Sequence, residues 1–420
     1  MAREAYLTYD EILKRDRPTA FGSMVKPVGS RCNLDCRYCY YLDKESIYGG
    51  VEPRMTEEVL EEYIRQYIEG NRVDTVSFTW HGGEPMLAGL EFYRKAVALQ
   101  QRYAKGKRIE NALQTNGILL DEEWCRFLKE NNFLVGISID GPQSIHDQNR
   151  LDKGGLGTFD RVIRGIERLR QFGVEFNTMS TVNAASEGRG REVYRFLKSI
   201  GSRYMQFMPV VEHTMTRADQ PRPFIVPPHT PGSEPAPWSV TAKGYGDFMC
   251  DIFDEWVIQD VGRYYVQLFD VSLAQWVGMR PALCAFCDTC GDSLVVEHNG
   301  DIYSCDHFVY PEYRLGNIGD STLKECYASR RQADFGAAKH NRVPEACRRC
   351  RYYFACRGEC PKHRFAKSSE GEEDLNTLCE GYLAFFRHVD PYMRYMAELL
   401  RTKRSPAWVM PWARQRMGIL

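Results

Sequence analysis

Strand-like and helix-like segments alternate along the chain from about Met24 to Pro209. The strand-like segments are short runs rich in β-branched and aromatic residues, and the helix-like segments repeat apolar residues every three or four positions. The predicted strands are residues 22–28, 74–80, 108–115, 133–139 and 174–182. The predicted helices are residues 56–69, 89–104, 121–131 and 158–172. Because crossover helices join parallel strands, this order predicts an α/β fold, and six such units fit a partial (β/α)6 barrel.

Residues at the ends of the predicted helices support this assignment. Thr56, Asp121 and Thr158 stand where N-caps belong, and Gly70 and Gly173 stand where helices should stop. In barrels of this kind the chemistry lies at the carboxyl ends of the strands. We therefore expect the functional residues in the loops that follow the strands.

The pattern changes twice after the predicted barrel. Seven prolines fall in residues 221–238, which we interpret as part of a long surface loop that begins near His213. Helical patterning resumes near residues 245–261, and after Gly278 the chain has little periodicity and many cysteines. We predict five parts. They are an N-terminal extension (1–20), the barrel (21–240), a connecting helical segment (241–278), a cysteine-rich domain (279–385), and a C-terminal helix and tail (386–420).

Composition and charge exclude several classes of function. The 420 residues carry a formal net charge of -1, which does not favour nucleic acid as a partner. The chain has no uninterrupted apolar run of about 18 residues, so we expect no membrane span. The N-terminus is too polar for a signal peptide, so we expect a cytoplasmic protein. In such a chain the 15 cysteines favour reduced thiolates that bind metal over disulfides.

The sequence 31-RCNLDCRYCYY-41 places Cys32, Cys36 and Cys39 in a C-x3-C-x2-C spacing directly after the first predicted strand. Three thiolates can hold three irons of a [4Fe–4S] cube and leave the fourth iron open to another ligand. A zinc knuckle or a plain electron-transfer cluster is the alternative interpretation. The spacing, at this place in a partial barrel, resembles the radical S-adenosylmethionine superfamily. The resemblance implies that the open iron binds the amino and carboxylate groups of S-adenosylmethionine.

Several strand ends carry further motifs: 80-WHGGEP-85, 114-QTNG-117, 138-SIDGP-142, 146-HDQNR-150 and 206-QFMPVV-211. A Gly–Gly turn lets the backbone approach a ligand closely, although such a turn is also an ordinary strand-to-helix connection. The resemblance implies cofactor contacts around the methionine amino group from Gly82, Gly83 and Glu84. It also implies contacts near the ribose and carboxylate from Ser138 and Arg150, and adenine contacts from Tyr41 and Val211. Gln114, Thr115 and Asn116 are the predicted substrate contacts.

A second group of cysteines follows residue 280. The motif 347-CRRCRYYFACRGEC-360, followed by Cys379, resembles the SPASM extension, which binds two auxiliary [4Fe–4S] clusters. With the first site, the resemblance implies three [4Fe–4S] clusters. It assigns one auxiliary cluster to Cys284, Cys290, Cys305 and Cys360, and the other to Cys347, Cys350, Cys356 and Cys379. Structural zinc sites are the alternative interpretation, since C-x2-C pairs also suit zinc.

Four cysteines do not fit this assignment cleanly. Cys287 lies between two predicted ligands and could replace one of them. Cys125, Cys250 and Cys326 lie in helix-like segments, and we expect them to be free thiols.

Asp306 follows the predicted ligand Cys305 directly. A surface aspartate in a turn is the simplest interpretation of this residue. However, the motifs MVKP, C-x3-C-x2-C-Y-Y, GGEP, QTNG, SIDGP, CD and RLGNI occur in one order over residues 20–395. This set resembles the anaerobic sulfatase-maturating enzymes. The resemblance implies oxidation of a cysteine or serine of a sulfatase to Cα-formylglycine, with Asp306 as the catalytic base.

The same resemblance implies two kinds of partner. One is an unfolded or nascent sulfatase that carries a C/S-x-P/A-x-R segment, and the other is an electron donor such as flavodoxin or ferredoxin. Two alternative functions stay open at this point. The chain could be another SPASM enzyme that forms a thioether or carbon cross-link in a peptide, or a non-catalytic iron–sulfur electron carrier.

Overall fold

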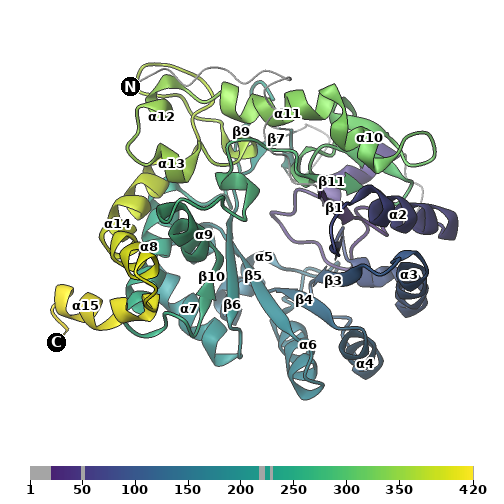
Figure 1. Ribbon diagram of the computed structural model, residues 1–420, viewed down its shortest axis with the longest axis horizontal. Coiled ribbons are helices and arrows are strands. Elements are labelled where there is room, and N and C mark those ends of the chain that lie inside the picture. Colours follow the sequence, from purple (N-terminus) through teal and green to yellow (C-terminus); the bar gives the residue numbers. More distant parts are fainter. Residues whose placement is uncertain (1–19, 49–52, 217–222, 228–229, 420) are drawn as a thin grey trace. The chain divides into compact units, whose positions relative to one another are not determined.

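The computed structural model describes residues 20–48, 53–216, 223–227 and 230–419 (Figure 1). The predicted N-terminal extension therefore lies almost entirely outside the described residues. The chain forms two compact units, each made from three separate segments. The first unit contains residues 1–138, 150–176 and 289–341, and the second contains residues 139–149, 177–288 and 342–420. These units divide the chain differently from the five predicted parts, whose boundaries stay a prediction.

The first unit is built on strands in the order β4-β3-β2-β1-β11-β12-β13. The strands from β4 to β11 pair in parallel, whereas β12 and β13 run antiparallel to their neighbours. Their bounds are β1 (Gly22–Val25), β2 (Thr75–Trp80), β3 (Arg108–Thr115), β4 (Phe133–Ser138), β11 (Ser293–Val296), β12 (Asp301–Tyr303) and β13 (Arg314–Asn317). The parallel part agrees with the strand–helix alternation of the sequence.

Helices of the first unit pack on these strands through apolar faces. Figure 1 shows α2, α3, α4 and α6 along one side of the strands. The helices are α2 (Glu57–Gly70), α3 (Leu90–Tyr103), α4 (Glu122–Glu130), α6 (Phe159–Gln171), α10 (Leu323–Ala328) and α11 (Arg330–Asn341). Tyr63 and Tyr67 of α2 contact Phe78 of β2, and Trp80 contacts Tyr93 of α3. Burying each such side chain contributes about 1.5–3 kcal/mol, so this aromatic cluster holds the helices on the sheet.

A hairpin brings a distant part of the chain to β1. Strand β11 pairs in parallel with β1, with Val25 opposite Val296. The chain then turns at residues 297–300 and returns as β12, which is antiparallel to β11. Cys305 and Asp306 follow β12 and begin a short 3-10 helix (Asp306–Phe308). The hairpin therefore returns Asp306 toward the end of β1, where the loop with the first three cysteines begins.

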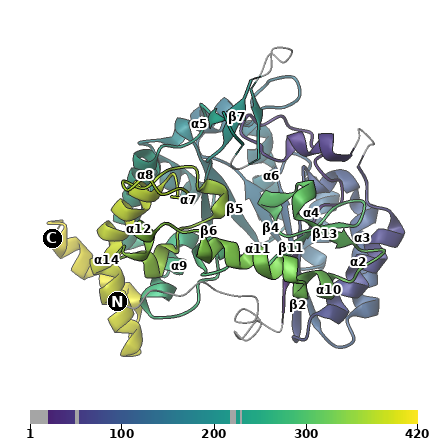
Figure 2. The same ribbon diagram turned by 90° about the horizontal axis from the view of Figure 1, so that it is seen from above.

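The second unit contains a parallel set of strands in the order β10-β6-β5 and a small antiparallel sheet in the order β8-β7-β9. The strands are β5 (Phe176–Val182), β6 (Tyr204–Pro209), β7 (His213–Met215), β8 (Phe224–Ile225), β9 (Glu234–Pro235) and β10 (Tyr265–Val266). The helices are α5 (Gln143–Asn149), α7 (Gly190–Ser199), α8 (Ala242–Gln259), α9 (Gln267–Trp276), α12 (Glu345–Arg348), α13 (Tyr353–Cys356), α14 (Cys379–Arg401) and α15 (Val409–Arg416). Figure 2 shows α14 beside α8, and Phe253, Phe269 and Phe385 lie in the aromatic core of these helices.

Two of the three predicted N-caps are confirmed. The side chains of Thr56 and Asp121 accept the N–H groups of Val59 and Trp124 at 3.3 and 2.9 Å. Thr158 also precedes its helix, but its side chain does not cap the helix. Its hydroxyl instead donates to the carbonyl of Arg150 at 2.9 Å, because this carbonyl lies within reach of the buried side chain.

The interpretation of residues 213–238 as a loop was wrong for its strand residues. Strands β7, β8 and β9 form the small antiparallel sheet, with Thr214 opposite Ile225 and Glu234. The many prolines obscured these strands, but Pro235 lies in an edge strand, where a missing N–H is tolerated. Residues 279–385 likewise contain more regular structure than their weak periodicity indicated, since β11–β13 and α10–α13 lie there. No helix in the described part of the chain combines the length and the apolar character needed to cross a membrane.

Candidate functional site

The first three cysteines lie in one loop that follows β1. Cys32, Cys36 and Cys39 are all partly exposed and none forms a disulfide. The N–H of Leu34 donates to the Cys32 sulfur at 3.4 Å, and the N–H of Cys39 donates to the Cys36 carbonyl at 3.1 Å. Burial, together with the nearby charges of Glu84 and Cys39, raises the pKa of Cys32 to about 12. A metal that binds these sulfurs would supply the positive charge that makes them thiolates.

The glycine turn after β2 packs directly on this cysteine loop. The N–H groups of Gly83 and Glu84 donate to the carbonyls of Gly29 and Arg31 at 2.8 and 2.9 Å. A Cβ atom at Gly83 would lie 2.0 Å from the Arg31 carbonyl oxygen, so only glycine allows this approach. Gly82 has φ +140°, a conformation that favours glycine. The turn thus fixes the backbone from which the cysteine loop starts.

Glu84 joins the glycine turn to the end of β3. Its fully buried carboxylate accepts the Thr115 hydroxyl and the Asn116 N–H, both at 2.8 Å, and the Met86 N–H at 3.0 Å. Burial raises the pKa of Glu84 to about 7, and these hydrogen bonds oppose the shift. The Asn116 amide donates to the Asn33 side chain at 2.8 Å, within the cysteine loop. Thr115 and Asn116 therefore connect β3 to the loop, and their predicted contact with substrate stays a prediction.

The other predicted cofactor contacts lie in both units. In the first unit, Ser138 accepts the Gln114 amide at 3.0 Å, and the Arg150 guanidinium lies 5.6 Å from the centre of the Tyr38 ring. Tyr41 is buried, and its hydroxyl donates to the fully buried carboxylate of Glu297. Val211 is a buried residue of the second unit. Tyr41 lies in the loop that follows β1 and Gly82, Gly83 and Glu84 lie in the turn that follows β2, whereas Arg150 follows helix α5.

Asp306 is held by residues from three other segments of the first unit. Its carboxylate forms an ion pair with Lys26, the first residue after β1, and accepts the hydroxyl of Tyr40 from the cysteine loop. The Lys26 ammonium also lies 3.1 Å from Nδ1 of His81, which precedes the glycine turn. Lys26 itself is fully buried. A carboxylate with these partners can accept a proton close to the cysteine loop.

The charges around Asp306 keep its carboxylate ionised. Burial alone would raise its pKa, but the charge of Lys26, as the largest opposing effect, holds the pKa of this carboxyl well below its usual range. Burial and the charge of Lys26 lower the pKa of His81 to about 4, so this imidazole is neutral at physiological pH. Nδ1 of His81 accepts the Gly82 N–H at 2.8 Å, which places the ring proton on Nε2.

The sequence motifs contained these partners, but the sequence analysis did not single them out. Lys26 belongs to MVKP and His81 to WHGGEP, and Tyr40 adjoins the predicted adenine contact Tyr41. One signal in the sequence could have indicated Lys26: it is a lysine at the end of an apolar strand, with no acidic residue close by in sequence. Its partner Asp306 could not be found without the β11–β12 hairpin.

One predicted auxiliary cluster site lies entirely in the second unit. Burial raises the pKa of Cys347 to about 12, and the charges of Cys379 and Cys350 add to this shift. Burial also raises the pKa of Cys356, with additional effects from Cys347 and Cys379. These mutual effects show that the four predicted ligands Cys347, Cys350, Cys356 and Cys379 lie near one another. The other predicted set is divided, with Cys290 and Cys305 in the first unit and Cys284 and Cys360 in the second.

Cys287 has contacts that set it apart from its neighbours. It is buried, and its sulfur donates to the carbonyls of Pro281 and Leu283 at 3.4 and 3.7 Å. These contacts hold the Cys287 sulfur against the backbone of its own segment. The assignment of Cys284 and Cys290 as ligands stays a prediction. Cys125 and Cys326 are buried and Cys250 is partly buried, and the expectation that they are free thiols stays a prediction.

The cysteine arrangement fits iron–sulfur clusters by the chemistry of its donors. Within the described ranges, no three His, Cys, Asp or Glu side chains are placed to hold a single metal ion. A cubane cluster does not require such convergence, because each thiolate binds a different iron. The three loop cysteines and the four mutually close cysteines of the second unit provide soft sulfur ligands of the kind that such clusters need.

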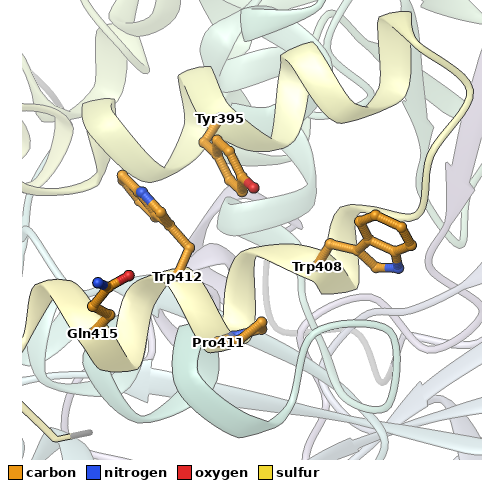
Figure 3. Close-up of a pocket in the computed structure, with 5 residues that line it drawn as sticks. All are labelled: Tyr395, Trp408, Pro411, Trp412 and Gln415. Atoms are coloured by element: carbon orange, nitrogen blue, oxygen red, sulfur yellow. The ribbon is translucent and has the colours of Figure 1, made fainter.

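A pocket near the C-terminus is separate from this chemistry. Figure 3 shows its lining residues between α14 and α15, which are Tyr395, Trp408, Pro411, Trp412 and Gln415. Neither a cysteine nor a carboxylate lines it. We therefore do not assign it to the candidate active site.

Comparisons with known proteins agree with this site. The profile of the radical SAM superfamily matches residues 27–197, and that of an iron–sulfur cluster-binding domain, SPASM, matches residues 284–351. A serine-type anaerobic sulfatase-maturating enzyme of Bacteroides thetaiotaomicron is 47% identical over 389 residues, which cover 92% of this chain and 94% of the relative. A cysteine-type enzyme of Clostridium perfringens is 33% identical over 387 residues, which cover 90% of this chain and 98% of the relative.

A solved structure shows the same fold. The structure of native anSMEcpe with bound AdoMet and Cp18Cys peptide superposes with a TM-score of 0.78 at 32% identity. The match covers 90% of this chain and 99% of that chain. The α/β fold with a radical SAM domain and a C-terminal SPASM domain is thus confirmed, and the chain is a radical SAM enzyme. It belongs to the family of anaerobic sulfatase-maturating enzymes.

Proposed function

We propose that this enzyme oxidises a serine or cysteine in a C/S-x-P/A-x-R segment of an unfolded or nascent sulfatase to Cα-formylglycine. Asp306 is the base that removes the proton from the hydroxyl or thiol. The observation that carries this proposal is the position of Asp306. It is an ionised, partly buried carboxylate that contacts Tyr40 of the cysteine loop and Lys26 at the end of β1.

The reaction removes two hydrogens from the side chain. When bound, the clusters and S-adenosylmethionine supply a 5′-deoxyadenosyl radical that takes a hydrogen atom from Cβ, and an acceptor for the remaining electron. Asp306 takes the second hydrogen as a proton from oxygen or sulfur, which is general base catalysis. A serine then becomes the aldehyde directly, whereas a cysteine gives a thioaldehyde that water hydrolyses with release of hydrogen sulfide.

The residues that hold the cofactors are part of the proposal. Cys32, Cys36 and Cys39 bind the cluster with the open iron, and the two sets of four cysteines bind two auxiliary clusters, which makes three [4Fe–4S] clusters. Gly82, Gly83, Glu84, Ser138, Arg150, Tyr41 and Val211 form the cofactor site, with Gln114, Thr115 and Asn116 near the substrate. The tight packing of Gly83 on Arg31 and the contact of Asn116 with Asn33 support a shared site at this loop.

The serine substrate is the first one to test. The relative with 47% identity is named a serine-type enzyme, and the cysteine-type relative is 33% identical. A small electron-transfer protein such as flavodoxin or ferredoxin would supply the electrons. The thiols free of disulfides fit a reducing, cytoplasmic setting.

The test is an anaerobic incubation of the reduced enzyme with S-adenosylmethionine and a synthetic peptide, in a serine and a cysteine version. Mass spectrometry should show the loss of two hydrogens from the serine peptide. The cysteine peptide should lose two hydrogens and exchange sulfur for oxygen. A peptide that loses two hydrogens but resists an aldehyde reagent would instead indicate a cross-link, and the formylglycine proposal would be wrong.

A further inference from the structure

Lys26 is a buried cation whose position requires an explanation. It follows β1 directly, its exposed fraction is 0%, and its backbone N–H donates to the carbonyl of Val296 at 2.8 Å. Burying an ammonium group is costly unless close partners compensate for the lost water. A lysine at this place is therefore retained for its contacts, since an apolar residue would pack there at lower cost.

The contacts of Lys26 all belong to the candidate active site. Its ammonium group forms the ion pair with Asp306, lies 3.1 Å from Nδ1 of His81, and lies 4.3 Å from the centre of the Tyr41 ring. Because Nδ1 of His81 also accepts the Gly82 N–H, this nitrogen carries no proton. It can therefore accept a hydrogen bond from the Lys26 ammonium. Lys26 thus links Asp306 to the glycine turn and to the predicted adenine contact.

These contacts define the orientation of the Asp306 carboxylate. Lys26 faces Oδ1, and the Tyr40 hydroxyl donates to Oδ2. With a partner on each oxygen, the carboxylate cannot rotate freely, yet each oxygen keeps a further lone pair for a substrate proton. Asp306 begins a short 3-10 helix of three residues, which by itself constrains the side chain little.

We propose that Lys26 is the positioning residue that holds the Asp306 carboxylate in the geometry needed for its role as base, an inference that rests on the proposed function. Lys26 acts through Asp306 and does not touch the substrate. Replacing Lys26 should therefore affect the two products, 5′-deoxyadenosine and formylglycine, to different extents. Cofactor cleavage, which does not need the base, should continue, whereas formylglycine formation should fail.

The experiment measures 5′-deoxyadenosine and formylglycine in the same anaerobic incubation with the serine peptide. For Lys26→Met we expect 5′-deoxyadenosine at nearly the wild-type level, and formylglycine per 5′-deoxyadenosine reduced on the order of 10²-fold. The double variant Lys26→Met/Asp306→Asn should show the same ratio as Asp306→Asn alone, because residues that act as a unit are not additive. An additional loss in the double variant would show that Lys26 acts independently of Asp306 and would overturn the proposal.

Two further variants separate positioning from folding. Lys107→Met makes the same substitution in the turn before β3, where the ammonium donates to the carbonyl of Ile68 in α2 at 2.6 Å, and it should leave the product ratio unchanged. Lys26→Gln keeps an N–H donor toward Asp306 without the charge, and its ratio should lie between those of Lys26→Met and the wild type. Parallel loss of both products in Lys26→Met and Lys26→Gln would assign Lys26 to folding and overturn the proposal.

The failure of this inference can be told apart from that of the proposed function. If Lys26→Met forms formylglycine per 5′-deoxyadenosine in the wild-type ratio, the role of Lys26 is overturned and the proposed function is not affected. A wild-type enzyme that cleaves the cofactor but forms no formylglycine would overturn the proposed function, and the role of Lys26 with it.

Discussion

The fully buried Lys26 at the end of β1 forms an ion pair with the partly buried Asp306 after β12, within the first unit. The two residues are far apart in sequence, and the parallel pairing of β1 with β11 brings them together. The pair has a direct chemical consequence, because the charge of Lys26 lowers the pKa of this carboxyl although burial alone would raise it. Asp306 is therefore ionised next to the cysteine loop, as its proposed role as a base requires.

Asp306→Asn should abolish formylglycine formation while cofactor cleavage continues. Asparagine keeps the shape of the side chain but cannot accept the substrate proton as a carboxylate does. We expect product formation to fall on the order of 10²- to 10⁴-fold, the usual contribution of a general base. Parallel assays of 5′-deoxyadenosine and of aldehyde in the peptide check this outcome. Equal rates of aldehyde formation in the variant and the wild type would show that Asp306 is not the base.

Gly83→Ala should prevent normal assembly of the cluster in the N-terminal loop. The new Cβ atom would lie 2.0 Å from the Arg31 carbonyl oxygen, so the backbone before Cys32 would have to move. We expect a loss of cofactor cleavage and a weaker spectrum of the reduced cluster. Gly89→Ala is the matched control, since its Cβ meets nothing within 4 Å although φ is +86°. The control should cost only about 1–2 kcal/mol of backbone strain and keep the cluster. An intact cluster in Gly83→Ala would contradict this account of the turn.

Glu84 should make the stability of the enzyme depend on pH. The folded enzyme holds the Glu84 proton up to about pH 7, whereas the unfolded chain releases it near the ordinary pKa of 4.5. Between these values the folded state binds more protons, so the free energy of unfolding should decrease as pH rises, by about 3 kcal/mol in total. The stability that protonated Glu84 contributes is complete below about pH 4.5 and is lost as the pH rises through about 7.

Anaerobic melting curves of the wild type and Glu84→Gln, at about pH 5.5 and about pH 8, measure this effect. Glutamine cannot ionise, so the difference in melting temperature between the two proteins should change with pH. A constant difference would show that the Glu84 pKa is ordinary in the folded enzyme.

Cysteine variants should separate ligands from free thiols. Three clusters correspond to about 12 irons per chain, and Cys356→Ala should reduce this content to about 8. Cys287→Ala should leave the iron content unchanged if its neighbours Cys284 and Cys290 are the ligands, as predicted. Iron analysis of proteins reconstituted side by side checks both outcomes. A loss of iron in Cys287→Ala equal to that in Cys284→Ala would make Cys287 a ligand.

The strand–helix part of the fold could be predicted from local pattern. Residues 108–115 and 133–139 are short strand-like runs between helix-like segments, and the structure has β3 and β4 there. Asp121 could be recognised as an N-cap because its effect is local. The strands at 213–215 and 224–225 are too short for a periodic signal, and their stability comes from pairing with each other.

The sequence indicated the candidate ligands of the site but not its network of contacts. Cys32, Cys36 and Cys39 were visible because their spacing is local. The link between Glu84 and Asn116, and that between Lys26 and Asp306, depend on which strands are neighbours in the sheet. Strand order is a long-range property that no spacing in the sequence encodes, so these contacts required the structure.

The central claim is that the enzyme removes a Cβ hydrogen atom and a side-chain proton in one oxidation. A serine peptide with deuterium at Cβ, incubated anaerobically with the reduced enzyme and unlabelled S-adenosylmethionine, tests it most directly. The account predicts formylglycine together with one deuterium in the 5′-deoxyadenosine that forms. Formylglycine with unlabelled 5′-deoxyadenosine, or labelled 5′-deoxyadenosine without any aldehyde, would contradict it.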